Sequence, residues 1–167
     1  MKLIGIDPSL AATGIHWGED GAAIYTKPSD PYRLSAIFTR VCEKSKGAHL
    51  AVIEDLPTHA FSAGLTGQAQ GVVRLALQVL KVPYITVPPA SLKVFATGSG
   101  RANKEAMRSA AEARLGSIPN YWDDNVVDAF WLEQMGVYYV KERGLRPEDF
   151  AKAGQARWGV LKGLIES

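Results

Sequence analysis

The chain has 167 residues, a length that fits one domain with a single hydrophobic core. Its composition, 47% hydrophobic and 22% charged, excludes a disordered or fibrous protein, and its net charge of +2 neither requires nor excludes a nucleic-acid partner. Cys42 is the only cysteine, which excludes an internal disulfide and a multi-cysteine zinc site. Because residues 1–7 form no signal-like segment and no long apolar run follows, we expect a cytoplasmic protein without a membrane partner.

The first 53 residues predict three short strands, a helix and a further strand. Apolar runs at 3–6, 14–17 and 22–25 are separated by turn residues, which is typical of strands joined as a hairpin or meander. Apolar residues recur at helical spacing over 32–46, just before a glycine, and predict a helix. The fully apolar run at 50–53 predicts the fourth strand.

The rest of the chain predicts one more strand and several helices. A helix over 68–80 leads to a strand at 83–87, and this alternation of strands and helices predicts a parallel portion of the sheet in an α/β fold. Helices are predicted for four further segments, at about 90–95, 104–115, 123–139 and 147–165. No linker, repeat or low-complexity block divides the chain, so we expect one domain over residues 1–167 with the last helix as a tail.

Three acidic residues stand at informative places in these elements. Asp7 closes the first strand, Glu54 closes the fourth, and Asp128 lies in an early turn of the long helix. Strand ends in an α/β sheet converge on one crevice, so Asp7 and Glu54 are expected to face each other near an apolar core, where unpaired charge is costly. Hard divalent cations prefer oxygen ligands, and two of them about 4 Å apart can activate water for phosphodiester hydrolysis. The pattern therefore predicts a metal-dependent hydrolase.

Each of these carboxylates also has an ordinary structural explanation. Asp7 is suited to cap a turn, and Glu54 to be a charge at a strand end. Asp123, Asp124 and Asp128 would complement the dipole of the helix that they begin. The order and spacing of the whole set favour the catalytic interpretation.

At these motifs the chain resembles the RuvC family of Holliday junction resolvases, from its start to about Gly136. Gly5-Ile6-Asp7-Pro8-Ser9 with Thr13-Gly14 is similar to the opening strand and turn of the family, although Ser9 stands where the family commonly has glycine. Val52-Ile53-Glu54 resembles its second acidic strand. The resemblance implies a ribonuclease H-like fold with a mixed five-stranded sheet flanked by helices.

Two further segments resemble the same family. Residues 67–72 look like its glycine-punctuated helix start, and residues 88–104 parallel its segment of paired lysines and a glycine loop. By this resemblance, Lys93 and Lys104 engage DNA near the scissile phosphate, and Arg101 adds charge between them. From the residues alone, the basic stretch suits either a phosphate backbone or a solvated loop and helix face.

The fourth acidic position of the family is altered in this chain. The helix that carries Asp128 usually has a second acidic residue, or a histidine, three positions earlier, where this chain has Asn125. Asp124 lies four residues before Asp128 and shares its helical face. We expect Asp124 to be the fourth ligand, with Asn125 as a weaker oxygen donor and Asp123 as the helix cap.

The loop after Glu54 holds two further candidates. Phe61 would stack on an unpaired base at a junction crossover, because family members place an aromatic residue in roughly this region. His59 would act as a general base or phosphate contact, although a lone histidine in a loop is usually solvated. The four tryptophans are assigned to packing.

The resemblance also implies an activity, a cofactor and partners. The protein would be an endodeoxyribonuclease that uses Mg²⁺, with Mn²⁺ able to replace it, and that cuts four-way junctions, with forks and flaps as further branched substrates. A four-way junction matches a two-fold symmetric homodimer. The helix at 67–80 or the tail around Trp158 would supply the dimer interface.

Two other functions remain open from the sequence. A junction-binding protein of the same fold, with turnover weakened or lost, would account for Asn125. Residues 7–9 with Thr13-Gly14 also resemble the first phosphate loop of actin-like ATPases and sugar kinases. Those proteins normally need two such domains, which 167 residues do not easily contain.

Overall fold

The structure, a computed structural model, describes residues 1–56 and 63–153. Its strands are β1 (Leu3–Asp7), β2 (Ala12–Trp17), β3 (Asp20–Tyr25), β4 (Leu50–Glu54) and β5 (Tyr84–Val87). They form one sheet in the order β3-β2-β1-β4-β5, in which β1, β2 and β3 pair antiparallel and β1, β4 and β5 pair parallel. The predicted mixed five-stranded sheet is therefore confirmed.

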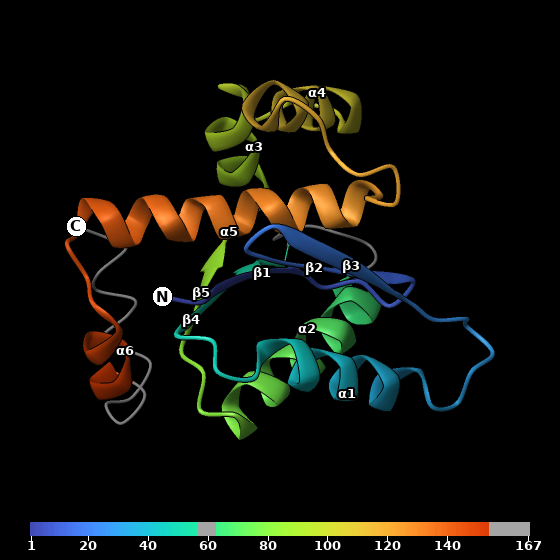
Figure 1. Ribbon diagram of the computed structural model, residues 1–167. Coiled ribbons are helices and arrows are strands. Elements are labelled where there is room, and N and C mark those ends of the chain that lie inside the picture. Colours follow the sequence, from blue (N-terminus) through green and yellow to red (C-terminus); the bar gives the residue numbers. More distant parts are fainter. Residues whose placement is uncertain (57–62, 154–167) are drawn as a thin grey trace.

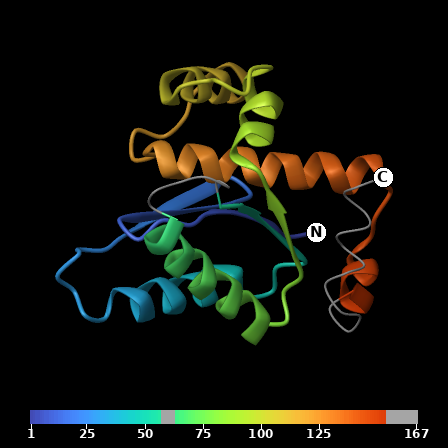
Figure 2. The same ribbon diagram turned by 180° about the vertical axis from the view of Figure 1, so that it is seen from behind.

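Helices cover both faces of this sheet. They are α1 (Arg33–Ser45), α2 (Ala63–Val79), α3 (Pro89–Thr97), α4 (Lys104–Leu115), α5 (Asp124–Glu142) and α6 (Pro147–Ala153). Figure 1 shows α1 and α2 against one face and α5 across the other, with α3 and α4 stacked on the outer side of α5. Seen from behind, β5 runs directly into α3, past α5 (Figure 2). The layers are therefore α1 with α2, the sheet, α5, and α3 with α4.

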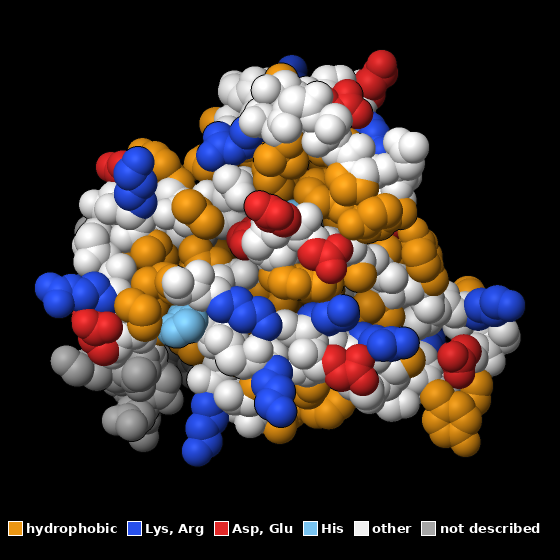
Figure 3. Space-filling view, viewed as in Figure 1, with side chains coloured by type: hydrophobic (Ala, Val, Ile, Leu, Met, Phe, Trp, Pro, Cys, Tyr) orange, Lys and Arg blue, Asp and Glu red, His pale blue; other side chains and the backbone are white. Residues whose placement is uncertain are grey.

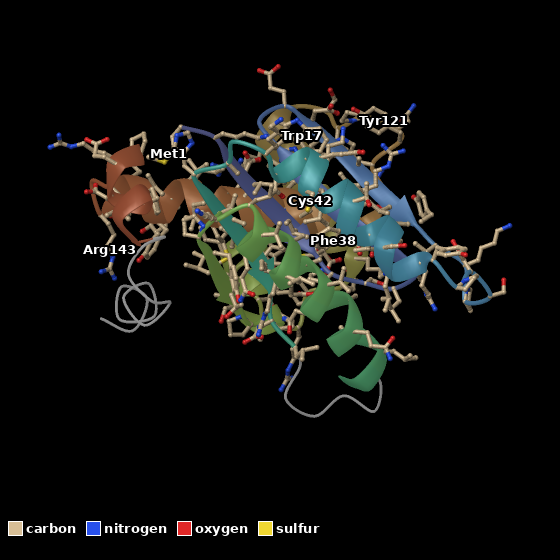
Figure 4. The ribbon with its side chains drawn as sticks, turned by 90° about the horizontal axis from the view of Figure 1, so that it is seen from below. Met1, Trp17, Phe38, Cys42, Tyr121 and Arg143 are labelled. Carbon is tan, nitrogen blue, oxygen red and sulfur yellow. The ribbon has the colours of Figure 1, made fainter. Side chains whose placement is uncertain are left out.

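The alternation of side chains along β1 divides the core between the two faces. Leu3 belongs to the cluster under α5, whereas Ile4 and Ile6 belong to the cluster under α1 and α2. On the second face, Phe38 and Cys42 lie along α1, on the side that α2 also covers (Figure 4). Because successive side chains of a strand point to opposite faces, the register of β1 also fixes the direction of Asp7, on the α5 side.

Two glycines allow α5 to lie directly on the strands. A Cβ atom at Gly5 would stand 1.9 Å from the carbonyl oxygen of Ala129, and one at Gly14 would stand 2.0 Å from that of Asn125. Any side chain at either position would therefore push the helix away from the sheet. Glycine within a strand often marks such a close backbone approach.

A buried polar pair crosses the same interface. The ring of His16 on β2 contacts the carboxylate of Glu133 on α5, and the backbone amide of Gly18 donates to the other Glu133 oxygen at 2.8 Å. The His16 ring also packs edge-on against Trp122 and Phe130, with ring centroids 4.7 Å and 5.2 Å away. The pair holds the β2–β3 hairpin against the middle of α5.

Some predicted boundaries were wrong by several residues. α2 begins at Ala63 rather than at 68, since Gly64 and Gly67, which have low helix propensity, lie within the helix. α5 continues to Glu142, and its predicted cap, Asp123, is confirmed because its side chain accepts a hydrogen bond from the amide of Val126. Of the tail helix predicted over 147–165, α6 covers the first seven residues, and the remainder lies outside the described residues.

The packing role predicted for the tryptophans is confirmed where the structure describes them. Trp122 and Trp131 are buried, and Trp17 is partly buried beneath the ammonium group of Lys44, which lies 4.5 Å from the ring centroid. Trp158 lies outside the described residues. None of the described helices is long and apolar enough to span a membrane.

Candidate active site

The carboxyl ends of β1 and β4 bring two of the predicted acidic residues to one edge of the sheet. The strands pair in parallel, with Ile6 opposite Ile53, so Asp7 and Glu54 follow at equivalent positions. Both point toward α5, because they are one residue beyond side chains that face the α1–α2 side. Asp7 is only 8% exposed. The expectation that these two residues face each other is confirmed by the interaction between their carboxyl groups.

The first turns of α5 bring the third acidic residue to the same edge. Asp123 caps the helix, and Asp128 follows after little more than one turn. The close contact of Gly14 with the backbone of Asn125 holds this end of the helix on the sheet. Asp128 therefore faces Asp7 and Glu54 closely enough to interact electrostatically with both.

Burial disfavours the charged form of all three carboxyl groups, and charge repulsion adds to this for Asp7 and Asp128, whereas a hydrogen bond with Asp7 favours the charged form of Glu54. Burial, followed by the charges of Glu54 and Asp128, raises the pKa of Asp7 well above its ordinary value. Burial also raises the pKa of Glu54, and burial together with the charges of Glu54 and Asp124 raises the pKa of Asp128 to about 7. Each group would be ionised at a lower pH if a cation lay between them.

The donor set fits a hard divalent cation. All three groups are carboxylates, which Mg²⁺ and Mn²⁺ prefer as ligands, and their raised pKa values indicate a cluster with too little positive charge. Within residues 1–56 and 63–153, no group of three His, Cys, Asp or Glu side chains already has the arrangement needed to hold a metal ion.

Two lysines from the α3–α4 lobe approach this cluster. Lys93 on α3 lowers the pKa values of both Glu54 and Asp128 through its charge. Lys104, the first residue of α4, forms an ion pair with Asp124, with 3.0 Å between its ammonium nitrogen and the carboxylate oxygen. The stacking of α3 and α4 on α5 thus brings basic residues to the acidic edge.

The other basic residues of this stretch differ in their surroundings. Arg101 is exposed, in the turn that precedes α4. The guanidinium of Arg108, by contrast, donates two hydrogen bonds of 2.9 Å to the carbonyl oxygen of Trp122. Arg108 therefore holds α4 to the segment that enters α5, and we assign it a structural role.

The two candidates for the fourth acidic position, Asp124 and Asn125, have different contacts. Asp124 is 43% exposed in its side chain and binds Lys104, yet its charge still reaches Asp128. The side-chain amide of Asn125 donates to Asp123 at 3.0 Å, and the hydroxyl of Tyr25 donates to the same carboxylate at 2.7 Å. Asn125 is therefore engaged with the helix cap.

Some functional candidates were missed by the sequence, and others cannot be placed. Phe61 and His59 lie outside the described residues. Gly5 and Gly14 were interpreted as parts of a motif, although glycine inside a strand is itself a signal of close packing. Tyr25 gave no signal, since its contact with Asp123 joins segments 98 residues apart.

A second group of cations lies on another part of the surface. Figure 3 shows Lys and Arg side chains across the lower half of this face, where α1 lies in the same view. Two cations that contact α1 residues have local partners: Arg40 pairs with Glu43 at 3.1 Å, and Lys2 donates to the backbone carbonyls of Lys44 and Lys46 at 2.8 Å. These contacts stabilise α1, and they add no support for a nucleic-acid surface there.

Comparison with known proteins gives consistent relatives. No protein-family model matches the chain. The crossover junction endodeoxyribonuclease RuvC of Carboxydothermus hydrogenoformans is 30% identical over 159 residues, which cover 87% of this chain and 99% of that protein. That of Brachyspira hyodysenteriae is 32% identical over 144 residues, 77% of this chain and 89% of that protein. The chain belongs to the RuvC family. This membership favours the RuvC resemblance over the one to actin-like ATPases.

The RuvC fold is also found among solved structures. Thermus thermophilus RuvC in complex with a Holliday junction substrate has a TM-score of 0.73 and 23% identity, over 85% of this chain and 96% of that chain. A second Thermus thermophilus RuvC structure has a TM-score of 0.70 and 22% identity, with the same coverage. The chain therefore has the ribonuclease H-like fold of RuvC, and its acidic edge lies within that fold.

Proposed function

We propose that this RuvC-family protein is a structure-selective endodeoxyribonuclease that resolves Holliday junctions by hydrolysing DNA phosphodiesters with divalent cations. The observation that carries the proposal is the meeting of Asp7, Glu54 and Asp128, which are far apart in sequence, at one edge of a RuvC fold. Forks and flaps are further candidate substrates. The named relatives are crossover junction endodeoxyribonucleases, which supports the same reaction class.

Asp7, Glu54 and Asp128 would hold the cation, with Asp124 as the fourth carboxylate. When bound, Mg²⁺ or Mn²⁺ supplies Lewis acidity toward the phosphate and lowers the pKa of a water nucleophile. The protein fixes the direction of its ligands through two parallel strands and a helix packed on glycines. Rigid elements of this kind hold carboxylates in a productive arrangement without further ordering.

The two lysines would act on the DNA rather than on the cation. Lys93 lies close enough to Glu54 and Asp128 to influence their charge, so a phosphate drawn to Lys93 would also be near the carboxylates. Lys104 would exchange its ion pair with Asp124 for a phosphate contact, which would free Asp124 for the cation. Arg101 would add affinity that carries no sequence preference.

We further propose that α2 forms the interface of a homodimer. Its outer face exposes Leu65, Leu75 and Val79, at 60%, 51% and 59%, and these residues repeat at helical spacing along one side. An apolar stripe on a helix is self-complementary when two copies meet about a two-fold axis. Sedimentation is expected to show a dimer for the wild type and a monomer for the Leu75→Asp variant. An unchanged dimer in this variant would contradict the assignment.

A second candidate function is favoured by one observation. Asn125 stands at the usual acidic position and is bound to Asp123, while Asp124 is engaged in an ion pair with Lys104. A protein with fewer free carboxylates would bind junctions with slow or no cleavage. A protein of this kind would keep the RuvC fold and the DNA-binding lysines of α3 and α4, Lys93 and Lys104, but would not cleave DNA efficiently.

The test uses end-labelled four-way junction, fork and linear duplex DNA of equal length. Wild-type protein is incubated with each substrate in Mg²⁺, Mn²⁺ or EDTA, and binding is measured in parallel in Ca²⁺. Cleavage of the junction in Mg²⁺ or Mn²⁺, with little cleavage of the duplex, is the expected result. Tight junction binding without cleavage in either cation would support the binding protein, and equal cleavage of all three substrates would contradict structure selectivity.

A further inference from the structure

One buried side chain on α2 contacts the backbone of a catalytic strand. Gln70 is only 3% exposed, and its amide nitrogen donates to the backbone carbonyl of Glu54 at 2.9 Å. The same nitrogen lies 3.3 Å from a carboxylate oxygen of Asp55. Both partners are acceptors, so the amide nitrogen, and not the oxygen, must face them.

Asp55 is turned away from the carboxylate cluster. It follows Glu54 directly, and alternation along the strand directs it to the α2 side of the sheet. One of its oxygens accepts from the backbone amide of Leu56 at 2.9 Å and from the guanidinium of Arg74 at 3.3 Å. Arg74 is one helical turn beyond Gln70, so two side chains of α2 bind the same Asp55 carboxylate.

These bonds fix the point where the chain leaves the sheet. The amide of Asp55 still donates to the carbonyl of Val87, the last residue of β5, at 2.8 Å. The carbonyl of Glu54 accepts instead from Gln70. Because the Arg74–Asp55 pair is about two-fifths exposed, it adds little, and the buried amide of Gln70 provides the firm contact.

We infer that Gln70 is a positioning residue, which sets the direction of the Glu54 carboxylate by holding the backbone carbonyl of Glu54 and the side chain of Asp55 at the strand end. This inference rests on the proposed function of Glu54 as a ligand of the catalytic cation. A backbone that is free to rotate at Glu54 would carry its side chain away from Asp7 and Asp128. Misplacement by about 1 Å in such a centre costs up to roughly 100-fold in rate.

The experiment replaces the donor without changing the size of the side chain. Gln70→Glu puts an acceptor against two acceptors, Gln70→Met removes the hydrogen bonds, and Thr39→Glu, an exposed position on α1, controls for added charge. Melting temperature, junction affinity in Ca²⁺, kcat and KM in Mg²⁺, and Mn²⁺ affinity of the free protein by electron paramagnetic resonance are measured for each.

The expected result separates positioning from folding. Both Gln70 variants should bind junction DNA as tightly as wild type, lose roughly 10- to 100-fold in kcat with little change in KM, and bind Mn²⁺ several-fold more weakly. Thr39→Glu should match wild type. A lower melting temperature with unchanged kcat and Mn²⁺ affinity would overturn the inference. If wild-type protein itself does not cleave, the proposed function fails, while the Mn²⁺ affinities still decide the role of Gln70.

Discussion

The carboxylate cluster should make the protein less stable than it would be without one of its charges. Burial and the charges of Glu54 and Asp124 raise the pKa of Asp128 from 3.8 to about 7. An acid whose pKa is higher in the folded than in the unfolded protein lowers stability progressively as the pH rises between those two values, and the loss is complete above the higher one. Asp128→Asn removes this charge with little change of shape.

The size of the effect follows from the pKa values. A rise from 3.8 to about 7 corresponds to about 4 kcal/mol at high pH. Asp128 is not fully buried, and the positive charges of Lys93 and Lys104 lie close by, so we expect about half of this, ~2 kcal/mol. For a domain of this length, that gain corresponds to a melting temperature about 4–8 °C higher.

Thermal unfolding in EDTA checks this prediction. At pH 8 Asp128→Asn should melt above wild type, the difference should shrink toward pH 4, and Mg²⁺ should stabilise wild type more than the variant. Glu19→Gln, an exposed charge in the β2–β3 turn, should change the melting temperature little. If Asp128→Asn melts at or below wild type at pH 8 in EDTA, the electrostatic account of the cluster is wrong.

Three further predictions concern the cation, the packing of α5 and the DNA contact of Lys93. Because protons compete with the cation for Asp128, Mn²⁺ affinity should fall as the pH drops below about 7, measured by electron paramagnetic resonance at pH 6 and 8; equal affinities would contradict it. Gly5→Ala should lower the free energy of unfolding by more than about 2 kcal/mol, since its Cβ would lie 1.9 Å from the carbonyl oxygen of Ala129, whereas Gly64→Ala, with open space around it, should not; similar urea midpoints would argue against the close packing. Lys93→Ala should weaken junction binding in Ca²⁺ and reduce its salt dependence by about one counterion, and an unchanged salt slope would exclude a phosphate contact.

The parts of the fold that the sequence predicts well are those with local causes. Runs of apolar residues bounded by turns identify all five strands, and the positions of Asp7 and Glu54 at the ends of two of them predict that the two residues face each other. The cap at Asp123 is equally local, since it depends on a side chain and an amide three residues later. These features require no knowledge of distant contacts.

The parts that the sequence does not predict depend on tertiary packing. The pairing of Lys104 with Asp124 exists because α3 and α4 stack on α5, and no local pattern specifies that docking. The early start of α2 was not predicted because Gly64 and Gly67 have low helix propensity, although both lie within the helix. The bond from Gln70 to Glu54 likewise arises where a helix and a strand end meet.

The most direct test of the account is single-turnover cleavage of a four-way junction by three proteins: wild type, Asp7→Asn and Glu43→Gln, whose substitution lies on the exposed surface of α1. Rates are measured in Mg²⁺ after junction binding in Ca²⁺ has been matched. We predict that Glu43→Gln cleaves as fast as wild type and that Asp7→Asn binds the junction but loses at least about 100-fold in rate. Cleavage by Asp7→Asn at the wild-type rate would contradict the assignment of this carboxylate edge as the catalytic centre.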